Sequence, residues 1–209
     1  ELDAISKGAQ IQQQMMLPSG QTLAQHLAKE TYNKLEKYLL SYDFPLAAVS
    51  GMKPWAAASI AAMLPYLKQG LNPQFGIDAH FLGLAKKDNK PLIELETPQF
   101  QLQLLEDMLG NDKAIMELMS LPTEDVSALV SYWRLGEMKK MASLIKTQMT
   151  PLQQQKMITN RNESWVAKLK KMIVAKPGLF VVIGAAHLVG EQGVPSLLEQ
   201  QGIKVKRID

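Results

Sequence analysis

The chain has 209 residues, enough for one sizeable hydrophobic core and about one domain, with 46% hydrophobic and 21% charged residues, an ordinary globular balance. No apolar run approaches the ~20 residues of a membrane span. The net charge of +3 is spread along the chain and gives no argument for a nucleic-acid partner, and the absence of cysteine excludes disulfides and thiolate chemistry.

The first part of the chain is expected to be mostly helical. Lys7–Gln21 has little periodicity and is predicted to be irregular, whereas apolar residues of Lys29–Leu40 recur at three- and four-residue spacing, as on one face of a helix. Pro54 suits the first position of an alanine-rich helix that continues through Ala56–Leu67. A further helix is predicted from Gly76 to about Lys87.

A short strand is predicted at Leu92–Glu96, followed by a helix that Thr97 caps and that Pro98 begins. Glu96 therefore stands where a strand meets a helix N-terminus, a place that favours an anion. Two interpretations stay open for Glu96: a solvated or capping carboxylate, or a member of a functional site.

From Gln99 to Val174 the chain is predicted to be almost wholly helical, and the last of these helices begins at Pro151. It carries Arg161 and Asn162. Adjacent residues of a helix point in directions about 100° apart, so these two side chains are expected to reach different partners. An arginine on a helix surface is commonly solvated, and that interpretation stays open beside a site role.

The C-terminal stretch has the pattern of a strand, loop, helix and strand. Leu179–Ile183 is an unbroken apolar run typical of a buried strand, Ser196–Gln201 is a short helix stopped by Gly202, and Ile203–Ile208 alternates apolar and basic residues. Such a unit favours a parallel sheet. Ligands of such sheets bind outside the carboxyl ends of the strands, and His187 lies at that point.

Elimination leaves His187 as the main candidate for chemistry. The sequence has no Gly-x-Ser-x-Gly, no phosphate-binding loop and no Gly-x-Gly-x-x-Gly. A metal held by histidine and carboxylates could activate water, but a catalytic site takes about three protein ligands. His26 and His80 fall in predicted helices and are expected to have surface or packing roles. The plainer alternative for His187 is a histidine that is hydrogen-bonded at a strand end.

Several phrases resemble the TraB/GumN (TraB/PrgY/GumN) family. They are Gly184-x-x-His187 with the following Leu-Val-Gly, Gly-Val-Pro-Ser-Leu-Leu and Gly-Ile-x-Val-x-Arg, an internal Leu-Glu-Thr that contains Glu96, and Arg161-Asn162-x-x-Trp165. The family includes Tiki-type metalloproteases and PrgY pheromone-shutdown proteins, and is distantly related to ChaN-like and erythromycin-esterase-like proteins.

The resemblance implies a fold. It is an α/β fold with a small, mostly parallel sheet flanked by helices and a large helical insertion at about residues 99–174, all in a single domain over residues 1–209. The opening Glu1-Leu2-Asp3 resembles a family segment that closes an early strand, which implies that the chain is truncated at its N-terminus and lacks a first GxxH segment.

The resemblance also implies site residues. In Tiki-type members two GxxH histidines and a glutamate are associated with metal-dependent peptide cleavage, so His187 and Glu1 are the expected metal ligands and catalytic groups. Arg161, as a stabiliser of a developing oxyanion, and Asn162 join the catalytic set, and Gly184 and Glu96 are expected to contact a cofactor. The implied function is a metal-dependent hydrolase, specifically a peptidase, that uses a divalent ion and is inactive as this fragment because the first histidine has no counterpart.

A binding protein is the alternative function. It would be a non-catalytic protein of the bacterial periplasm or cell envelope whose ligand is a peptide signal or haem, as ChaN-like relatives suggest, with His187 as an axial or hydrogen-bonding group. A third hypothesis is a helical interaction module of the cell envelope. In each case the expected partner is a peptide or a small molecule.

Overall fold

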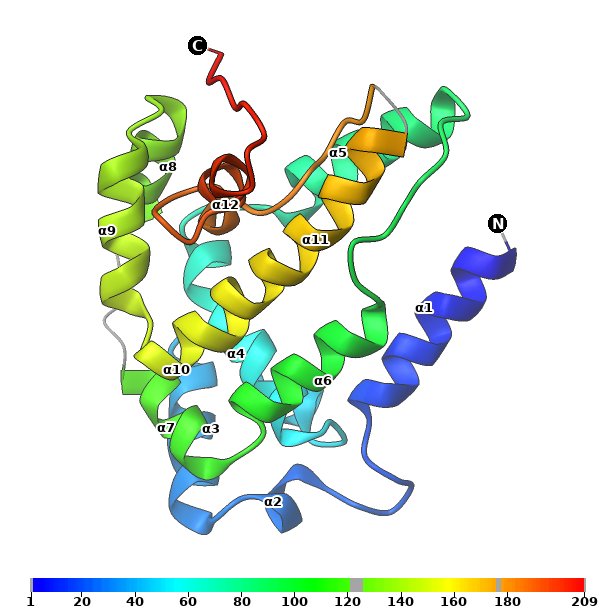
Figure 1. Ribbon diagram of the computed structural model, residues 1–209. Coiled ribbons are helices and arrows are strands. Elements are labelled where there is room, and N and C mark those ends of the chain that lie inside the picture. The colour runs from blue at the N-terminus through cyan, green and yellow to red at the C-terminus, as the bar shows by residue number, and fades with distance from the viewer. Residues whose placement is uncertain (1, 121–125, 176–177, 209) are drawn as a thin grey trace. The chain divides into compact units, whose positions relative to one another are not determined.

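The structure is a computed structural model that describes residues 2–120, 126–175 and 178–208 (Figure 1). These residues are mostly helical and contain no β-sheet; their one paired extended contact is an isolated antiparallel bridge between Met16 and Met52. The predicted α/β fold with a parallel sheet is therefore wrong. None of the helices in these ranges is long and apolar enough to cross a membrane.

The three predicted strands are uncoiled but unpaired. Leu92–Glu96, Leu179–Ile183 and Ile203–Ile208 lie outside every helix, and among the described residues no backbone hydrogen bond joins one of these segments to another. A strand needs a neighbour ~4.8 Å away to pair its N–H and C=O groups. Their apolar and alternating patterns indicated partial burial, which β-branched residues also reach by packing on a helix, and so the patterns did not guarantee pairing.

Several of the predicted helices are confirmed. Helix α3 occupies Lys29–Leu40 as predicted, and the Thr97 hydroxyl accepts a hydrogen bond from the Phe100 N–H at 3.2 Å and caps α6. The prediction of an irregular segment at Lys7–Gln21 is wrong up to Met15, because helix α1 runs over Leu2–Met15; the residues of this segment after Met15 lie outside any helix. The described part of residues 99–174 is helical, but no sheet exists here into which it could be inserted.

The chain divides into two compact units. The first comprises Glu1–Leu71 and Thr97–Glu124. Its core lies where the alanine-rich face of α4 meets leucine side chains of α3, because small side chains let helices approach closely; Ala57, Ala61, Leu35 and Leu39 are fully buried. The helices of this unit are α1 (Leu2–Met15), α2 (Leu23–His26), α3 (Lys29–Leu40), the 3₁₀ turn η1 (Leu46–Val49), α4 (Pro54–Lys68), α6 (Pro98–Leu109) and α7 (Asp112–Ser120).

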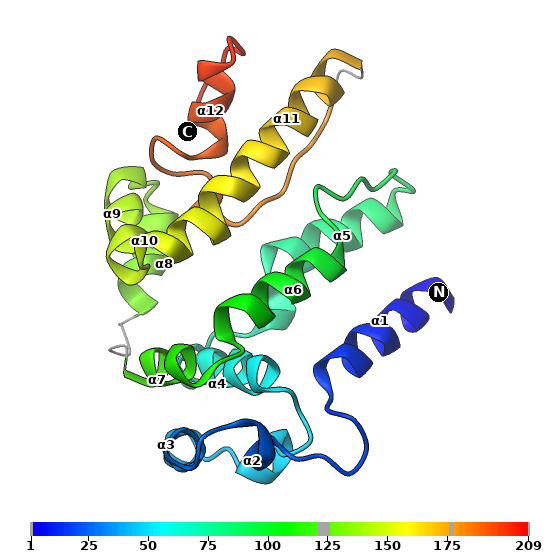
Figure 2. The same ribbon diagram turned by 60° about the horizontal axis from the view of Figure 1, so that its bottom comes forward.

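The second unit comprises Asn72–Glu96 and Asp125–Asp209 and contains the site described below. Its longest helix, α11, packs against α12, and Figure 2 shows the two side by side. Trp165, Leu169 and Val194 form the centre of its core. The helical elements of this unit are η2 (Pro73–Phe75), α5 (Ile77–Lys87), α8 (Val126–Arg134), α9 (Met138–Gln148), α10 (Pro151–Gln154), the π-helical turn η3 (Gln155–Thr159), α11 (Asn160–Ala175), η4 (Ala185–His187) and α12 (Val194–Gln200).

Candidate functional site

The site is built on the first turns of α11, directly after a π-helical turn. The turn η3 spans Gln155–Thr159, and the backbone carbonyl of Met157 in it accepts a hydrogen bond from Nη1 of Arg161 at 3.1 Å. Such π turns are rare and occur frequently at functional sites. This bond directs the side chain of Arg161 toward the N-terminus of α11.

Glu96 is the partner of Arg161. Nε of Arg161 donates to Oε2 of Glu96 at 3.1 Å and Nη2 donates to Oε1, so the guanidinium holds the carboxylate with two bonds. Trp165, four residues after Arg161 and therefore on the same helix face, donates its indole N–H to Oε2 at 3.2 Å. The ion pair is nearly buried, with side-chain exposures of 15% for Arg161 and 9% for Glu96.

Asn162 points to a different partner, His187. Nδ2 of the fully buried Asn162 donates to the backbone carbonyl of Gln192 at 2.6 Å, which fixes the orientation of the amide. Oδ1 of Asn162 therefore faces Nδ1 of His187, at 2.6 Å. An amide oxygen only accepts, so Nδ1 carries the imidazole proton and Nε2 keeps its lone pair.

His187 is held in its neutral form. Burial, and to a lesser extent the nearby positive charge of Arg161, lower the pKa of His187 to about 4, although the negative charge of Glu96 opposes both effects. The ring lies 4.4 Å from that of Trp165, between centroids, and the guanidinium carbon of Arg161 lies 4.9 Å from the same indole ring. At neutral pH the site thus contains an uncharged imidazole beside a compensated ion pair.

The structure brings four of the predicted site residues together. We call Glu96, Arg161, Asn162, Trp165 and His187 the His187 cluster; they are connected by the hydrogen bonds and ring contacts above.

The other two predicted residues are Gly184 and Glu1. The backbone carbonyl of Gly184 accepts a hydrogen bond from the His187 N–H at 2.9 Å. A side-chain carbon added at Gly184 would lie 3.7 Å from Cδ2 of His187, an ordinary contact, so space alone does not require glycine there. Glu1 lies outside the described residues. His26 and His80, predicted to have surface or packing roles, are exposed.

Two participants were missed as site members. Trp165 stands in the Arg-Asn-x-x-Trp phrase, and its spacing of four from Arg161 was a usable signal that both side chains share a face. Gln192 contributes a backbone carbonyl, and no side-chain pattern marks such a group. Its role depends on a loop that returns to α11 thirty positions away in sequence.

The described residues do not by themselves fit a divalent metal. Nowhere in residues 2–120, 126–175 and 178–208 does a group of three histidine, cysteine, aspartate or glutamate side chains lie close enough to hold one. Both oxygens of Glu96 already accept hydrogen bonds from Arg161 or Trp165. Nε2 of His187 is one suitable donor where about three are needed.

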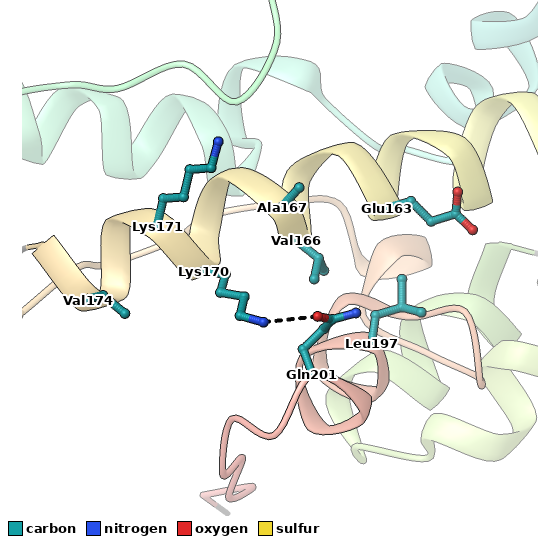
Figure 3. A pocket seen from close by; sticks show the side chains of 8 residues that line it. All are labelled: Glu163, Val166, Ala167, Lys170, Lys171, Val174, Leu197 and Gln201. Atoms are coloured by element: carbon teal, nitrogen blue, oxygen red, sulfur yellow. Dashed lines mark hydrogen bonds between the residues drawn. The ribbon is translucent and has the colours of Figure 1, made fainter.

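A cavity of about 720 Å³ lies between α11 and α12 (Figure 3). Its polar contact is the bond from Nζ of Lys170 to Oε1 of Gln201, 3.1 Å long. No member of the His187 cluster lines it. Because its walls otherwise consist of aliphatic surface and solvated charges, this cavity brings no reactive groups together.

Comparison with known proteins identifies relatives. The sequence profile described as the TraB/PrgY/gumN family matches residues 1–207. The chain is similar to the protein YbaP of Escherichia coli (strain K12) and to YbaP of Shigella flexneri, each 26% identical over 187 residues, which cover 87% of this chain and 70% of the relative. Both relatives are described as uncharacterized. No solved structure matches the chain.

Proposed function

Because the chain belongs to the TraB/PrgY/gumN family, we propose that it is a hydrolase that cleaves peptides and that His187 carries the proton in the reaction. The observation that supports this proposal is the state of His187. The ring is buried and neutral, its Nδ1–H is committed to Asn162, and its Nε2 lone pair has no hydrogen-bond partner among the described residues. A positioned neutral imidazole is the commonest general base of enzymes.

The proposed chemistry is general acid–base hydrolysis. Nε2 of His187 takes a proton from a water molecule as its oxygen adds to the peptide carbonyl, and gives that proton to the leaving amine nitrogen as the C–N bond breaks. Burial and Arg161 disfavour the intermediate imidazolium, so the proton is passed on rather than kept. Asn162 acts as a positioning residue because it fixes the tautomer and the ring plane.

Arg161 is proposed to stabilise the oxyanion that develops on the carbonyl. A guanidinium has five N–H groups, and Arg161 gives one each from Nε, Nη1 and Nη2 to Glu96 and Met157. Glu96 and Trp165 hold this charge in place, and preorganised charges of this kind contribute strongly to catalysis. No step is assigned to a metal, since the ligand set of the described residues is incomplete.

The test is a cleavage assay with a matched control. The protein is incubated with a mixed peptide library, and products are identified by mass spectrometry. His187→Gln should lower the cleavage rate by about 10²–10⁴-fold, the typical contribution of a general base. His80→Gln, at an exposed histidine, should leave the rate unchanged. Equal rates in all three proteins would eliminate the proposal.

A haem-binding or peptide-signal-binding protein is the second candidate. The incomplete metal set together with the one free imidazole nitrogen favours it, because a single lone pair suffices for an axial ligand. A haem absorbance band that appears on mixing with the wild-type protein and is lost in His187→Gln would favour this candidate over the hydrolase. Calorimetric titration with Zn²⁺ and Mn²⁺, with His187→Ala as control, tests metal binding in the same samples.

A further inference from the structure

An apolar groove lies beside the His187 cluster in the second unit. It has a volume of about 520 Å³, and two uncoiled segments, residues 91–95 and 178–182, line it together with α5 and α11. Many of its side chains are apolar yet strongly exposed: Leu92 is 55% exposed, Ile93 56% and Phe180 74%. A contiguous exposed apolar surface of this kind commonly marks a binding site.

Both uncoiled walls have backbone groups without partners. Among the described residues, no N–H or C=O group of Leu92–Glu94 or of Leu179–Ile183 takes part in a hydrogen bond. Two neighbouring rows of free donors and acceptors are what the edges of a sheet present to an incoming strand. Side-chain packing alone leaves these groups unsatisfied, so the walls are suited to bind a backbone as well as apolar side chains.

The groove leads to the site, because both walls end there. The segment from Leu92 runs into Glu96, and the segment from Leu179 runs through Gly184 to His187. Leu95 and Ile183, near the ends of the two walls, both pack on the core that contains Trp165. A chain that lay along the walls would therefore have one end close to the His187 cluster.

We propose that this groove binds a peptide in extended conformation, as a β-strand between residues 91–95 and 178–182, with apolar side chains at alternate positions. The inference rests on the proposed function in one respect: the bound peptide is the substrate. The wall of five residues spans about 16 Å at the ~3.3 Å rise of a strand, so it holds about five residues of the peptide. Backbone pairing supplies affinity, and alternate apolar side chains that face α5 and α11 supply selectivity.

Binding is tested on a variant that is expected to cleave the peptide far more slowly than the wild-type protein. A fluorescein-labelled octapeptide of alternating valine and serine is titrated with the His187→Gln variant, and binding is followed by fluorescence polarisation. The control peptide has the same side chains but is N-methylated at every second residue, on the valines in one version and on the serines in another. At least one version should bind about tenfold more weakly, because it loses backbone donors. Equal affinity for all three peptides would overturn the strand-pairing proposal.

A pair of variants checks the wall itself. Val181→Pro removes a backbone N–H, whereas Val181→Thr keeps that N–H and nearly the same shape. Val182→Pro and Val182→Thr form the same pair for the neighbouring N–H, since successive N–H groups of a strand point in opposite directions. One proline variant should bind the octapeptide about 5- to 10-fold more weakly than its threonine counterpart, the loss expected for a net hydrogen bond. Full affinity in both proline variants would contradict the proposal.

Hydrogen exchange distinguishes a bound peptide from a strand that the protein itself supplies. The amides of Leu92–Glu94 and Leu179–Ile183 should exchange rapidly in the free protein and slow down when the octapeptide is added. Protection already in the free protein would mean that another part of the polypeptide fills the groove, and it would overturn the proposal.

The groove proposal and the hydrolase proposal can be refuted independently of each other. Binding of the octapeptide without cleavage by the wild-type protein would refute the hydrolase and leave the groove assigned. Cleavage of library peptides without any binding of the octapeptide would refute the groove alone.

Discussion

At the scale of single residues, the two hydrogen bonds of the Asn162 side chain determine the tautomer of His187. The side-chain amide of Asn162 has an NH₂ donor and an oxygen acceptor, and the NH₂ group donates to the Gln192 carbonyl. The oxygen end must then face His187, which leaves the imidazole one possible neutral tautomer. Burial and the charge of Arg161 keep that ring from taking up a proton.

This arrangement predicts a pH-dependent stability. The pKa of His187 is about 4 in the folded protein and about 6.5 in the unfolded chain, so the unfolded state binds the proton first as the pH falls. Stability that is present above about pH 6.5 should decrease by about 3 kcal/mol by pH 4. Urea unfolding at a series of pH values measures this loss. His187→Gln should lack this component and His80→Gln should retain it; equal slopes for wild type and His187→Gln would contradict the assignment.

At the scale of elements, the first turns of α11 provide three side chains of the His187 cluster. Arg161 and Trp165, four residues apart, both reach Glu96, while Asn162, turned about 100° from Arg161, reaches the loop of His187. Two uncoiled segments, which have no partner strands among the described residues, thus contact α11 through side chains. The ion pair between Glu96 and Arg161 joins the first of these segments to α11.

Removal of one charge of this pair should be costly. Glu96→Gln leaves the guanidinium of Arg161 nearly buried without its counter-ion, and loss of one partner of a buried ion pair typically destabilises a protein by about 3–5 kcal/mol. Glu94→Gln, at an exposed position two residues earlier, should change stability by less than about 0.5 kcal/mol. Thermal and urea unfolding of the two variants give the comparison. A double variant, Glu96→Gln with Arg161→Met, should recover part of the loss because no unpaired charge remains.

At the scale of the whole molecule, the described residues form two separate hydrophobic clusters. One is centred on Leu35 and Leu39 in the first unit and the other on Trp165 and Leu169 in the second, and the two clusters share no residue. The helical stretch that follows Thr97 is divided between the two units, so continuity in sequence does not correspond to one packed body.

Core truncations should therefore act locally. Leu35→Ala and Leu169→Ala each remove a buried side chain and should each cost about 2–5 kcal/mol in the unit that contains it. Hydrogen exchange followed by mass spectrometry should show faster exchange in α3 and α4 for the first variant and in α11 and α12 for the second. Faster exchange throughout the chain in either variant would show that the two cores open together.

The sequence by itself predicted several of the helices and four residues that the structure brings into one cluster. Helical hydrogen bonds link residues four apart, so spacing, caps and prolines sufficed to place α3, α4 and α6 closely. The phrases that contain Glu96, Arg161, Asn162 and His187 marked four members of one cluster. The spacing of four residues from Arg161 could also have predicted Trp165 as a member.

Only the tertiary structure decided how the uncoiled segments are used. An apolar run such as Leu179–Ile183 becomes a strand only when a second strand lies beside it. Among the described residues no second strand does so, and Phe180 in this run is left 74% exposed. The tautomer of His187 likewise depends on the carbonyl of Gln192 reaching Asn162 across thirty positions of sequence. Both outcomes follow from contacts between distant parts of the chain, which a local pattern cannot specify, whereas helices need only their own neighbours.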